Sequence, residues 1–396
     1  MSLLAHETDA LMTITSRPDI VFTKGQGSWL WDRRGRKYLD LIQGWAVNCL
    51  GHCHPSMVQA LQKQSLSLIN PSPAFYNEPA MGLANRLIQA SCFDRVFFTN
   101  SGAEANEGNI KLARKWGQKH RHGAYKIITF ENGFHGRTLA TMSASGKPGW
   151  DQKFPPQVDG FPKAVLNDID SVKKLIDADT VAVMLEPVQG EAGVIPATRE
   201  FMQDLRALTK EKGILLIVDE VQTGMGRCGS LFAYQLFDIE PDLMSLGKGI
   251  GGGVPLAAQL AKEFVCSFEP GDQGGTYNGN PLCTEVGCAV FDVLTEPGFL
   301  EQVNERAEQL SQGLQNISQK WNMLGERGMG LLRALLLDKE DGHAIVDAAR
   351  EYPEFGLLLN APRPNLLRFM PALNLSEATL QLALDTLDKV IAEVRK

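Results

Sequence analysis

The chain has 396 residues, of which 44% are hydrophobic and 21% charged, and its formal net charge is −7. This length exceeds one ordinary hydrophobic core, so we expect a larger and a smaller domain. The negative net charge is unlike that of nucleic-acid-binding proteins, and no apolar run is long enough to cross a bilayer. We therefore expect that the protein binds neither nucleic acid nor a membrane.

The start of the sequence does not resemble a secretory signal. Residues 1–19 have no basic region ahead of an apolar stretch and no small-residue cleavage site, so we expect a cytoplasmic protein. Residues 27–41 alternate aromatic and polar side chains around Arg34 and Gly35, which predicts a hairpin. The next segment holds a cluster of possible metal ligands without a second pair at zinc-finger distance, so we interpret it as a structural loop and expect no metal. The cluster comprises Cys49, His52, Cys53 and His54.

The middle of the chain alternates short apolar runs with amphipathic stretches, which indicates buried strands covered by helices. This pattern predicts an α/β fold with a mostly parallel sheet. Gly213 is expected to end one of the helices. The predicted strands are Arg95–Thr99, Lys126–Phe130, Val181–Leu185, Ile214–Val218, Leu243–Leu246 and Leu256–Leu260, and the predicted helices are Ala105–Gln118, Ser171–Ala178 and Arg199–Lys212.

Both ends of the chain differ from this middle part. A helical pattern covers residues 300–321, and a closing helix is predicted over residues 376–395, with Leu380, Leu384 and Leu387 on one face. We assign residues 1–59 and 291–396 to one small α+β domain. Residues 60–290 are then the large domain.

Two strand ends in the large domain carry residues suited to chemistry. In parallel sheets ligands bind beyond the carboxyl ends of the strands. Asp219, Glu220, Val221 and Gln222 follow one predicted strand, and Lys248 follows the next one between Gly247 and Gly249. A lysine in such an uncrowded backbone can form an imine with an aldehyde cofactor. A carboxylate beside it can stabilise a protonated pyridine nitrogen.

Other interpretations of this glycine-rich segment are weaker. Gly247, Gly249 and Gly252 satisfy the dinucleotide pattern G-x-G-x-x-G, but no clean βαβ unit with a downstream acid follows. A nucleotide P-loop requires Ser or Thr after the lysine, and Gly249 stands there. Taken alone, Lys248 would more often be a solvated loop residue, so its neighbours decide.

Two further strand ends supply candidate ligand-binding groups. Ser101, Gly102 and Ala103 open a predicted helix, where amide groups bind phosphate. A capping box between Ser101 and Glu104 explains the same pattern without a ligand, and both readings can hold together. After the strand that ends at residue 130, Phe134 could stack on a flat cofactor and Arg137 could clamp a substrate carboxylate, although either could also be an ordinary core or surface residue.

Several long motifs resemble the class III, ornithine-type aminotransferases, and within them most closely the acetylornithine branch. The resemblance covers nearly the whole chain. Its most specific part runs from Ile217 to Ala258 and reads IVDEVQTGMGRCGSLFAYQLFDIEPDLMSLGKGIGGGVPLAA. The other parts are NSGAEANE from Asn100, FHGRT from Phe134, EPVQGEAG from Glu186, GGTYNGNP from Gly274 and LLRFMPAL from Leu366.

The resemblance implies the pyridoxal-phosphate-dependent transferase fold of type I, with pyridoxal 5'-phosphate as the cofactor. Lys248 would then hold the cofactor as a Schiff base, and Asp219 would bind its ring nitrogen. Thr276 would reach the phosphate in a neighbouring subunit, which implies a homodimer with shared active sites. The remaining cofactor-binding residues that the resemblance implies are Ser101, Gly102, Ala103, Phe134, Glu220, Val221 and Gln222.

The resemblance also implies the substrates. Arg137 and Gly275 would contact them, Arg368 would take the α-carboxylate of 2-oxoglutarate, and Glu191 would pair with Arg368 while an amine donor is bound. The alternative for the last two residues is a permanent structural ion pair. The implied reaction moves the δ-amino group of N2-acetyl-L-ornithine to 2-oxoglutarate, giving N-acetylglutamate 5-semialdehyde and glutamate in arginine biosynthesis.

One departure bears on the amine donor. Ornithine-type relatives often have a tyrosine in a Tyr-x-Arg stretch near the N-terminus, where this chain reads Thr15, Ser16, Arg17. That tyrosine is linked to a free α-amino group, so its absence favours an acylated donor. Succinylornithine, ornithine and other ω-amines stay open as donors. A decarboxylase or isomerase of the same fold, and a non-catalytic relative, are further alternatives.

Overall fold

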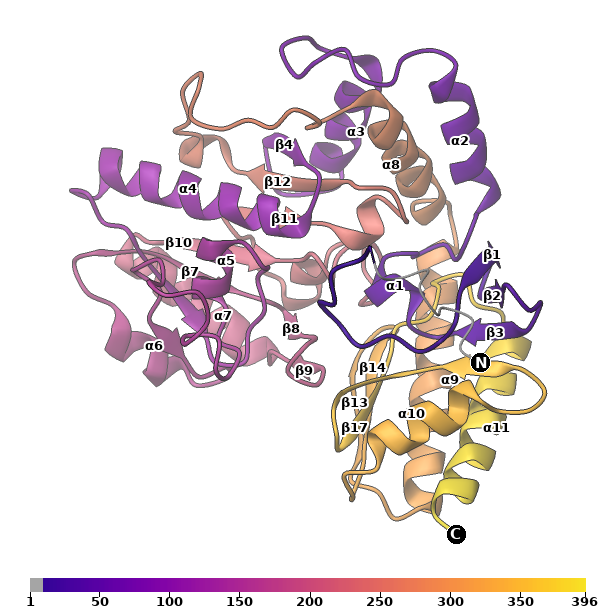
Figure 1. The fold of residues 1–396 in the computed structure, drawn as a ribbon. Helices are drawn as coiled ribbons and strands as arrows, with labels where there is room; N and C mark the ends of the chain where they lie inside the picture. Colours follow the sequence, from indigo (N-terminus) through magenta and orange to yellow (C-terminus); the bar gives the residue numbers. More distant parts are fainter. Residues whose placement is uncertain (1–9) are drawn as a thin grey trace.

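The computed structural model describes residues 10–396 (Figure 1). Its largest sheet has seven strands in the order β4-β12-β11-β10-β7-β5-β6. β12 runs antiparallel to both of its neighbours, and the other pairs are parallel, so the predicted mostly parallel sheet of an α/β fold is confirmed. The strands are β4 (Arg95–Thr99), β5 (Lys126–Phe130), β6 (Lys163–Ala164), β7 (Thr180–Leu185), β10 (Leu215–Asp219), β11 (Leu243–Leu246) and β12 (Ala257–Ala261).

Helices cover both faces of this sheet, as the alternating apolar pattern predicts (Figure 1). The helix over Arg199–Lys212 has the predicted bounds, and Gly213 ends it with φ +59°, a left-handed conformation that favours glycine. The helices around the sheet are α3 (Glu78–Gln89), α4 (Gly102–His120), α5 (Leu139–Ala144), α6 (Ile169–Leu175), α7 (Arg199–Lys212) and α8 (Pro281–Leu294), with the short 3-10 turns η1 (Ala233–Phe237), η2 (Lys248–Ile250) and η3 (Glu263–Val265).

The two ends of the chain meet in a second layer of smaller sheets. The predicted N-terminal hairpin is present as β2 and β3, and the C-terminal strand β15 pairs with β3 in parallel. One small sheet contains β1 (Phe22–Gln26), β2 (Trp29–Asp32), β3 (Lys37–Asp40) and β15 (Gly356–Leu358). A second contains β13 (Gly325–Met329), β14 (Leu332–Leu336), β17 (Leu366–Phe369) and β16 (Asn360–Arg363). The third is the hairpin of β8 (Val188–Gln189) and β9 (Ile195–Pro196).

Of the remaining helices, α2 packs against α8 beside the large sheet, whereas α9, α10 and α11 pack beside these small sheets (Figure 1). The predicted closing helix is α11, which Ser376 caps and which buries Leu380, Leu384 and Leu387. The predicted domain limits at 59/60 and 290/291 fall inside α2 and α8. The division into two domains at these positions stays a prediction. These helices are α1 (Gln43–Ala46), α2 (Pro55–Ser65), α9 (Phe299–Lys320), α10 (Gly342–Arg350) and α11 (Glu377–Val394).

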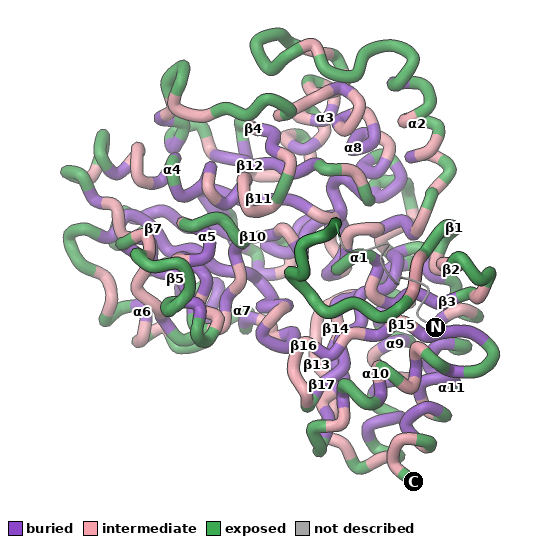
Figure 2. Tube along the Cα trace, in the orientation of Figure 1, coloured by how far each residue is buried: buried purple, intermediate pink, exposed green. Residues whose placement is uncertain are grey.

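The strands of the large sheet form the buried centre of the molecule, while loops at its rim are exposed (Figure 2). Every residue of β7, β10, β11 and β12 is buried. Because β12 is antiparallel to both β11 and β4, β4 runs in the same direction as β11. Six of the seven strands therefore run the same way, and their carboxyl ends lie at one edge of the sheet. Within residues 10–396, no helix has the length and apolar character needed to span a bilayer.

Candidate active site

Lys248 and Asp219 lie at the ends of neighbouring strands. β10 and β11 are parallel, Asp219 pairs with Ser245, and Lys248 follows three residues later at the start of η2. Lys248 has φ +47°, a left-handed conformation that is costly for a residue with a side chain. Strain of this kind persists where the surrounding structure holds it and is concentrated at functional sites.

The surroundings of Lys248 favour its neutral amine. Burial lowers the pKa of Lys248 below its ordinary value, and the charge of Arg368 also lowers it, while Glu191, Asp219 and Glu186 oppose both effects. No described residue accepts a hydrogen bond from its Nζ atom. A buried lysine amine whose pKa is lowered can act as a nucleophile and as a base once it has lost its proton.

A buried hydrogen-bond network fixes the carboxylate of Asp219. Its Oδ2 accepts from Asn106 Nδ2 at 2.7 Å and lies 2.8 Å from His135 Nδ1. Its Oδ1 accepts from the backbone N–H of Val221 at 3.1 Å and from Ser245 Oγ at 3.4 Å. An ionised carboxylate only accepts hydrogen bonds, so these donors stabilise it as an anion at one defined position.

The N-terminus of α4 lies against the residues that follow β10. Ser101 and Glu104 form the capping box that the sequence predicts. A Cβ atom at Gly102 would lie 2.6 Å from Val221 Cγ1, so only glycine allows this approach. The N–H groups of Gly102 and Ala103 belong to the first turn, where a helix has no internal acceptor for them. These two amides are therefore candidate anion-binding groups beside Val221, and the Ser101 hydroxyl precedes them in the chain.

Glu186 and Phe134 meet beside Asp219. The backbone N–H of Phe134 donates to Glu186 Oε2 at 2.8 Å. Burial raises the pKa of Glu186 to about 8, and the negative charge of Asp219 raises it in the same direction. The Phe134 ring contacts Trp150 edge to face, with 5.6 Å between ring centroids. The stacking role predicted for Phe134 is untested by these contacts and stays a prediction.

Gln222 and Glu220 point to different neighbours. A Cβ atom at Gly190 would lie 1.5 Å from Gln222 Oε1, so this amide packs directly on the β8–β9 hairpin. Both oxygens of Glu220 accept backbone N–H groups of η1, at 2.6 and 2.7 Å. Burial raises the pKa of Glu220 to about 7. The contacts of Glu220 stabilise η1, and a role in cofactor binding stays a prediction.

Arg368 is fully buried and carries one unpaired nitrogen. Its Nη1 donates to Glu191 Oε1 and to the carbonyl of Gly190, both at 2.9 Å, and its Nε donates to Asn360 Oδ1 at 2.9 Å. Its Nη2 is buried without a partner among the described residues. Such a donor is costly to leave unsatisfied, so it suits the carboxylate of a bound molecule. The guanidinium also lies over Trp45, 5.5 Å from the ring centroid.

Glu191 is held as an anion by surrounding cations. Burial acts to raise the pKa of Glu191, but Arg368, Lys248 and Lys147 together hold it below the ordinary value. Lys147 Nζ lies 3.9 Å from its second oxygen. The predicted pairing of Glu191 with Arg368 is present. Whether the pair opens during the reaction stays a prediction.

Arg137 lies at the exposed rim of this region. Its guanidinium lies over Trp150 at 5.7 Å from the ring centroid, and Lys147 lies over the same ring at 5.4 Å. Neither contact neutralises the positive charge of Arg137. The side chain is therefore available to a carboxylate that approaches from solvent.

Gly275 and Thr276 lie on the exposed loop before α8. The Thr276 carbonyl accepts from Asn70 Nδ2 at 3.4 Å, and its hydroxyl has no partner among residues 10–396. Asn100 Nδ2 donates to Asn278 Oδ1 at 2.8 Å and ties this loop to the residue before Ser101. The structure thus leaves the Thr276 hydroxyl outside the group of contacts around Lys248.

Three residues of this site were not predicted from the sequence. Asn106 and His135 bind Asp219, and Glu186 binds the backbone of Phe134. All three stand inside motifs that the sequence displays. Asn106 lies one helical turn after Ala103, His135 follows Phe134, and Glu186 directly follows the predicted strand Val181–Leu185. The signal that could have found them is this proximity, since a polar residue buried beside a functional carboxylate needs a partner.

The cluster of Cys49, His52, Cys53 and His54 is divided among separate contacts. Cys49 Sγ donates to the carbonyl of Gly249 at 3.2 Å, and His52 Nε2 lies 2.8 Å from Asp40 Oδ2. These contacts place the cluster in the loop beside η2 and β3.

The site is chemically suited to pyridoxal 5'-phosphate. Within the part of the chain that the structure describes, it has a primary amine without a partner, a fixed carboxylate, unpaired amides at a helix N-terminus and an unsatisfied guanidinium nitrogen. A Cβ at Gly102 or Gly247 would meet Val221 within 3.0 Å, so both glycines keep backbone close to this carboxylate. These groups match, in turn, an aldehyde, a ring nitrogen, a phosphate and a substrate carboxylate.

Residues 13–391 match the family model described as Aminotransferase class-III. The chain belongs to the class III aminotransferases. This aminotransferase is 69% identical over 396 residues to "Acetylornithine aminotransferase 2" of Bordetella pertussis, with 100% of both chains covered. It is 63% identical over 399 residues to "Acetylornithine aminotransferase" of Ralstonia nicotianae, with 100% of this chain and 98% of the relative covered.

A solved structure agrees with these sequence relatives. The crystal structure of N-acetylornithine aminotransferase from Stenotrophomonas maltophilia K279a superposes with a TM-score of 0.83 at 36% identity, and covers 95% of this chain and 96% of its own. The sequence-based expectations of the type I fold, the family and an aminotransferase activity are confirmed. The decarboxylase or isomerase and the non-catalytic relative are thereby disfavoured.

Proposed function

We propose that this aminotransferase moves the δ-amino group of N2-acetyl-L-ornithine to 2-oxoglutarate and serves arginine biosynthesis. The main support for this amine donor is the 69% identity, over the full length, to a relative named for acetylornithine. The stretch Thr15-Ser16-Arg17, which lacks the tyrosine linked to a free α-amino group, supports an acylated donor over ornithine. Succinylornithine differs only in the acyl group and is the second candidate.

We propose that the amides of Gly102 and Ala103, with the Ser101 hydroxyl, hold the phosphate of pyridoxal 5'-phosphate. Asp219 would bind the ring nitrogen, and Lys248 would bind the reactive aldehyde carbon. Phe134 and Val221 would contact the two faces of the ring. When bound, the cofactor supplies an electron sink for the carbanion that deprotonation creates. Gln222 is proposed to lie near the phenolic oxygen, and Thr276 to reach the phosphate from a second subunit.

The residues of the chain then handle protons and carboxylates. Lys248 Nζ, whose pKa is lowered by burial, takes the proton from the δ-carbon of the donor. Asp219 keeps the proton on the ring nitrogen, because three side chains and one amide hold its charge in place. Arg137 binds the donor's carboxylate.

Arg368 and Glu191 let one pocket serve two substrates. With the donor bound, Glu191 neutralises the buried Arg368, to which it hydrogen-bonds at 2.9 Å. With 2-oxoglutarate bound, the α-carboxylate takes Arg368, including its unpaired Nη2, and Glu191 withdraws. A buried guanidinium without a counter-charge would be costly, so one of the two anions is present at each stage.

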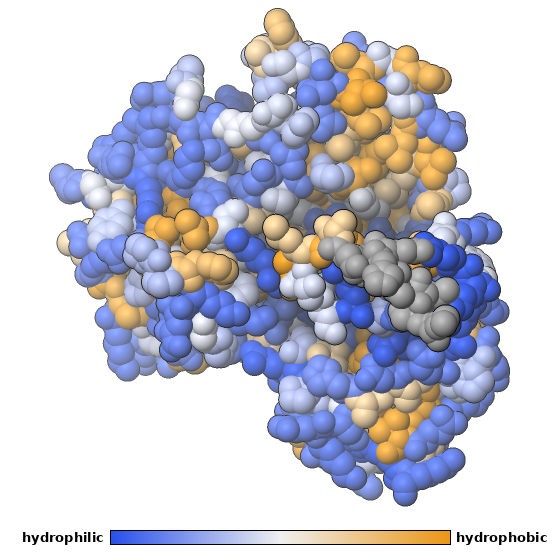
Figure 3. Space-filling view, viewed as in Figure 1, coloured by the Kyte–Doolittle hydropathy of each residue, from blue (hydrophilic) through white to orange (hydrophobic). Residues whose placement is uncertain are grey.

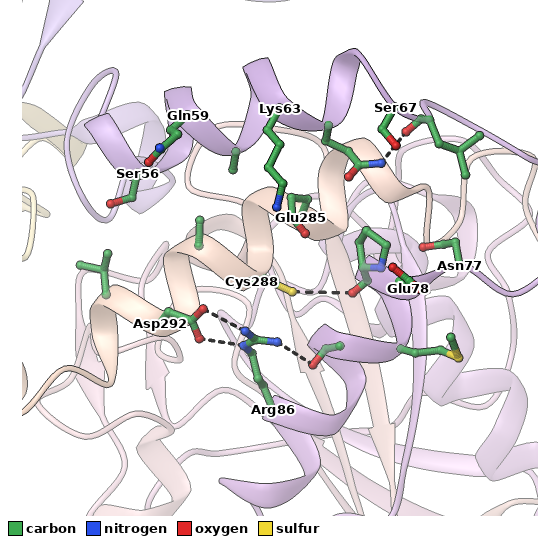
Figure 4. A pocket seen from close by; sticks show the side chains of 18 of the residues that line it. Ser56, Gln59, Lys63, Ser67, Asn77, Glu78, Arg86, Glu285, Cys288 and Asp292 are labelled. Carbon is green, nitrogen blue, oxygen red and sulfur yellow. Dashed lines mark hydrogen bonds and ion pairs between the residues drawn. The ribbon is translucent and has the colours of Figure 1, made fainter.

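We propose a homodimer whose two active sites share residues. Exposed apolar side chains gather on the face that carries α2, α3 and α8, mostly in the segment that joins α2 to α3 (Figure 3). A cavity of about 1080 Å³ opens between these helices, where Arg86 binds Asp292 at 2.7 and 2.9 Å (Figure 4). A second copy that covers this face would bring its own Thr276 loop to a neighbouring site. The exposed apolar residues are Leu66, Leu68, Ile69, Phe75, Tyr76 and Met81.

The cytoplasm is the proposed compartment, since all seven cysteines are free, as is usual in a reducing environment. Light scattering of the eluting protein tests the dimer, and a monomer at micromolar concentration would contradict it.

Stopped-flow absorbance tests the amine donor. The cofactor-loaded protein is mixed separately with N2-acetylornithine, N2-succinylornithine and ornithine, without a keto acid. We expect the visible cofactor band to bleach fastest with N2-acetylornithine. Faster bleaching with N2-succinylornithine would transfer the proposal to that donor, and a stable band with all three would reject this substrate class.

A further inference from the structure

Two arginines of the small β13–β14–β17–β16 sheet lie in one row across it. Arg327 on β13 pairs with Ala334 on β14, and Ala334 pairs with Arg368 on β17. Directly opposed residues in an antiparallel sheet point to the same face. Arg327 and Arg368 therefore extend from the same face of this sheet, one strand apart.

Both arginines bind the β8–β9 hairpin, which carries Glu191. Arg368 donates to the carbonyl of Gly190 and to Glu191, both at 2.9 Å. Arg327 donates to the carbonyl of Gly193 twice, from Nε at 3.0 Å and from Nη2 at 2.8 Å. The two guanidinium groups thus hold the hairpin turn on both sides of Glu191.

The hairpin turn lies directly against the sheet. Gly193 has φ +111°, and a Cβ there would come within 2.5 Å of Leu366 and 3.2 Å of Arg327 Nη2. The neighbouring Glu326 turns to the other face and binds Arg333 at 3.0 Å. No acidic residue of the described chain forms an ion pair with Arg327, so the Gly193 carbonyl is its acceptor.

We propose that Arg327 is a positioning residue for the reaction, because its two hydrogen bonds to the Gly193 carbonyl hold Glu191 where it can pair with Arg368. This inference rests on the proposed alternation of Glu191 and a substrate carboxylate at Arg368. When a ligand carboxylate takes Arg368, the hairpin loses its anchor at Glu191 and keeps the one at Gly193. Glu191 can then withdraw by side-chain rotation and return without refolding of the turn.

The proposal predicts an unequal effect on the two half-reactions. Without Arg327 the turn is less fixed, so the Glu191–Arg368 pair forms less completely while the amine donor is bound. The keto-acid half needs Arg368 free and does not need this pair. The donor half should therefore suffer and the acceptor half should not.

The test uses Arg327→Gln, with Arg327→Lys as the conservative variant and Arg363→Gln as the matched control. Arg363 lines the same cavity of about 420 Å³ as Arg327, but its Nη2 donates to Asn132 Oδ1 at 3.4 Å and not to the hairpin. With the cofactor-loaded protein we expect Arg327→Gln to slow the half-reaction with N2-acetylornithine about ten-fold, as loss of a charge-assisted hydrogen bond does. The half-reaction with 2-oxoglutarate should change less than about two-fold, and Arg327→Lys should recover part of the loss.

A second readout needs neither cofactor nor substrate. Hydrogen–deuterium exchange of the unloaded protein should be faster at residues 190–195 in Arg327→Gln, and unchanged there in Arg363→Gln. Equal slowing of both half-reactions, or exchange at residues 190–195 that matches the wild type, overturns the inference. A wild-type protein that fails to react with N2-acetylornithine contradicts the proposed donor alone, since the exchange measurement does not involve it.

Discussion

His135 Nδ1 lies 2.8 Å from Asp219 Oδ2, and both side chains are almost fully buried, with 2% and 3% of their surfaces exposed. Because an ionised carboxylate has no proton to give, the proton of this hydrogen bond belongs to His135 Nδ1. Its Nε2 is buried and has no partner among residues 10–396. His135 therefore helps to fix the orientation of the Asp219 carboxylate.

This contact predicts that His135→Phe weakens the hold of the protein on its cofactor. The ring volume is kept while the hydrogen bond to Asp219 is lost, so we expect cofactor affinity to fall about ten-fold. Equilibrium dialysis followed by absorbance measures the dissociation constant. Ser143→Ala, which removes a hydroxyl that binds Gln157 at 2.9 Å instead, serves as the control. An unchanged affinity in His135→Phe would mean that the other donors to Asp219, from Asn106, Val221 and Ser245, suffice.

Replacement of Lys248 separates catalysis from folding. Lys248→Ala removes the proposed nucleophile and base, so turnover should fall by more than about a thousand-fold. The far-UV circular dichroism of the variant should match the wild type, and some cofactor should stay bound through its phosphate. Loss of the folded signal would show that the lysine is structural.

The left-handed backbone at Lys248 gives a companion prediction. With φ +47°, glycine is favoured over alanine at this position. Lys248→Gly should be more stable than Lys248→Ala by about 1 kcal/mol in denaturant unfolding. The opposite order would contradict the backbone conformation described for η2.

Glu191→Ala should affect one half-reaction more than the other. The variant leaves the buried Arg368 without its counter-charge while the amine donor is bound, and this state is the one that the pair stabilises. We expect the donor half-reaction to slow at least about ten-fold, and the 2-oxoglutarate half to slow much less. Equal loss in the two single-turnover rates would falsify the alternation and favour a permanent ion pair.

Glu186 predicts a pH dependence of stability. Its pKa rises from 4.5 to about 8 on folding, so the stabilising effect of the protonated carboxyl is complete below the unfolded value and is lost as pH rises through the folded one. Glu186→Gln keeps an acceptor for the Phe134 N–H and cannot ionise. Without cofactor, the free energy of unfolding of Glu186→Gln minus that of the wild type should increase by about 2 kcal/mol between about pH 6 and about pH 9. Denaturant unfolding at both pH values measures this, and a constant difference would refute it.

Local patterns predicted the elements of the large sheet well. The strands over residues 95–99, 126–130 and 243–246 and the helix Arg199–Lys212 have the bounds expected from apolar periodicity and capping residues. The order of the strands and the antiparallel insertion of β12 could not be predicted this way. Strand order depends on pairings between distant segments, which local periodicity does not encode.

The site shows the same division. Lys248 and Asp219 follow consecutive strands of the chain that are also neighbours in the sheet, so their proximity could be inferred. The contacts of Glu220 with η1 and of Arg327 with Gly193 join segments far apart in sequence. Such contacts depend on how loops pack on the sheets, and neither a motif nor a spacing indicates them.

The most direct test of the proposed reaction is the fate of the donor's δ-nitrogen. N2-acetyl-L-ornithine labelled with ¹⁵N at the δ position is incubated with the cofactor-loaded protein and 2-oxoglutarate, and the glutamate formed is measured by mass spectrometry. We predict that nearly every new glutamate carries the ¹⁵N label and that none forms without the donor. Unlabelled glutamate, or consumption of the donor without glutamate, would contradict the account.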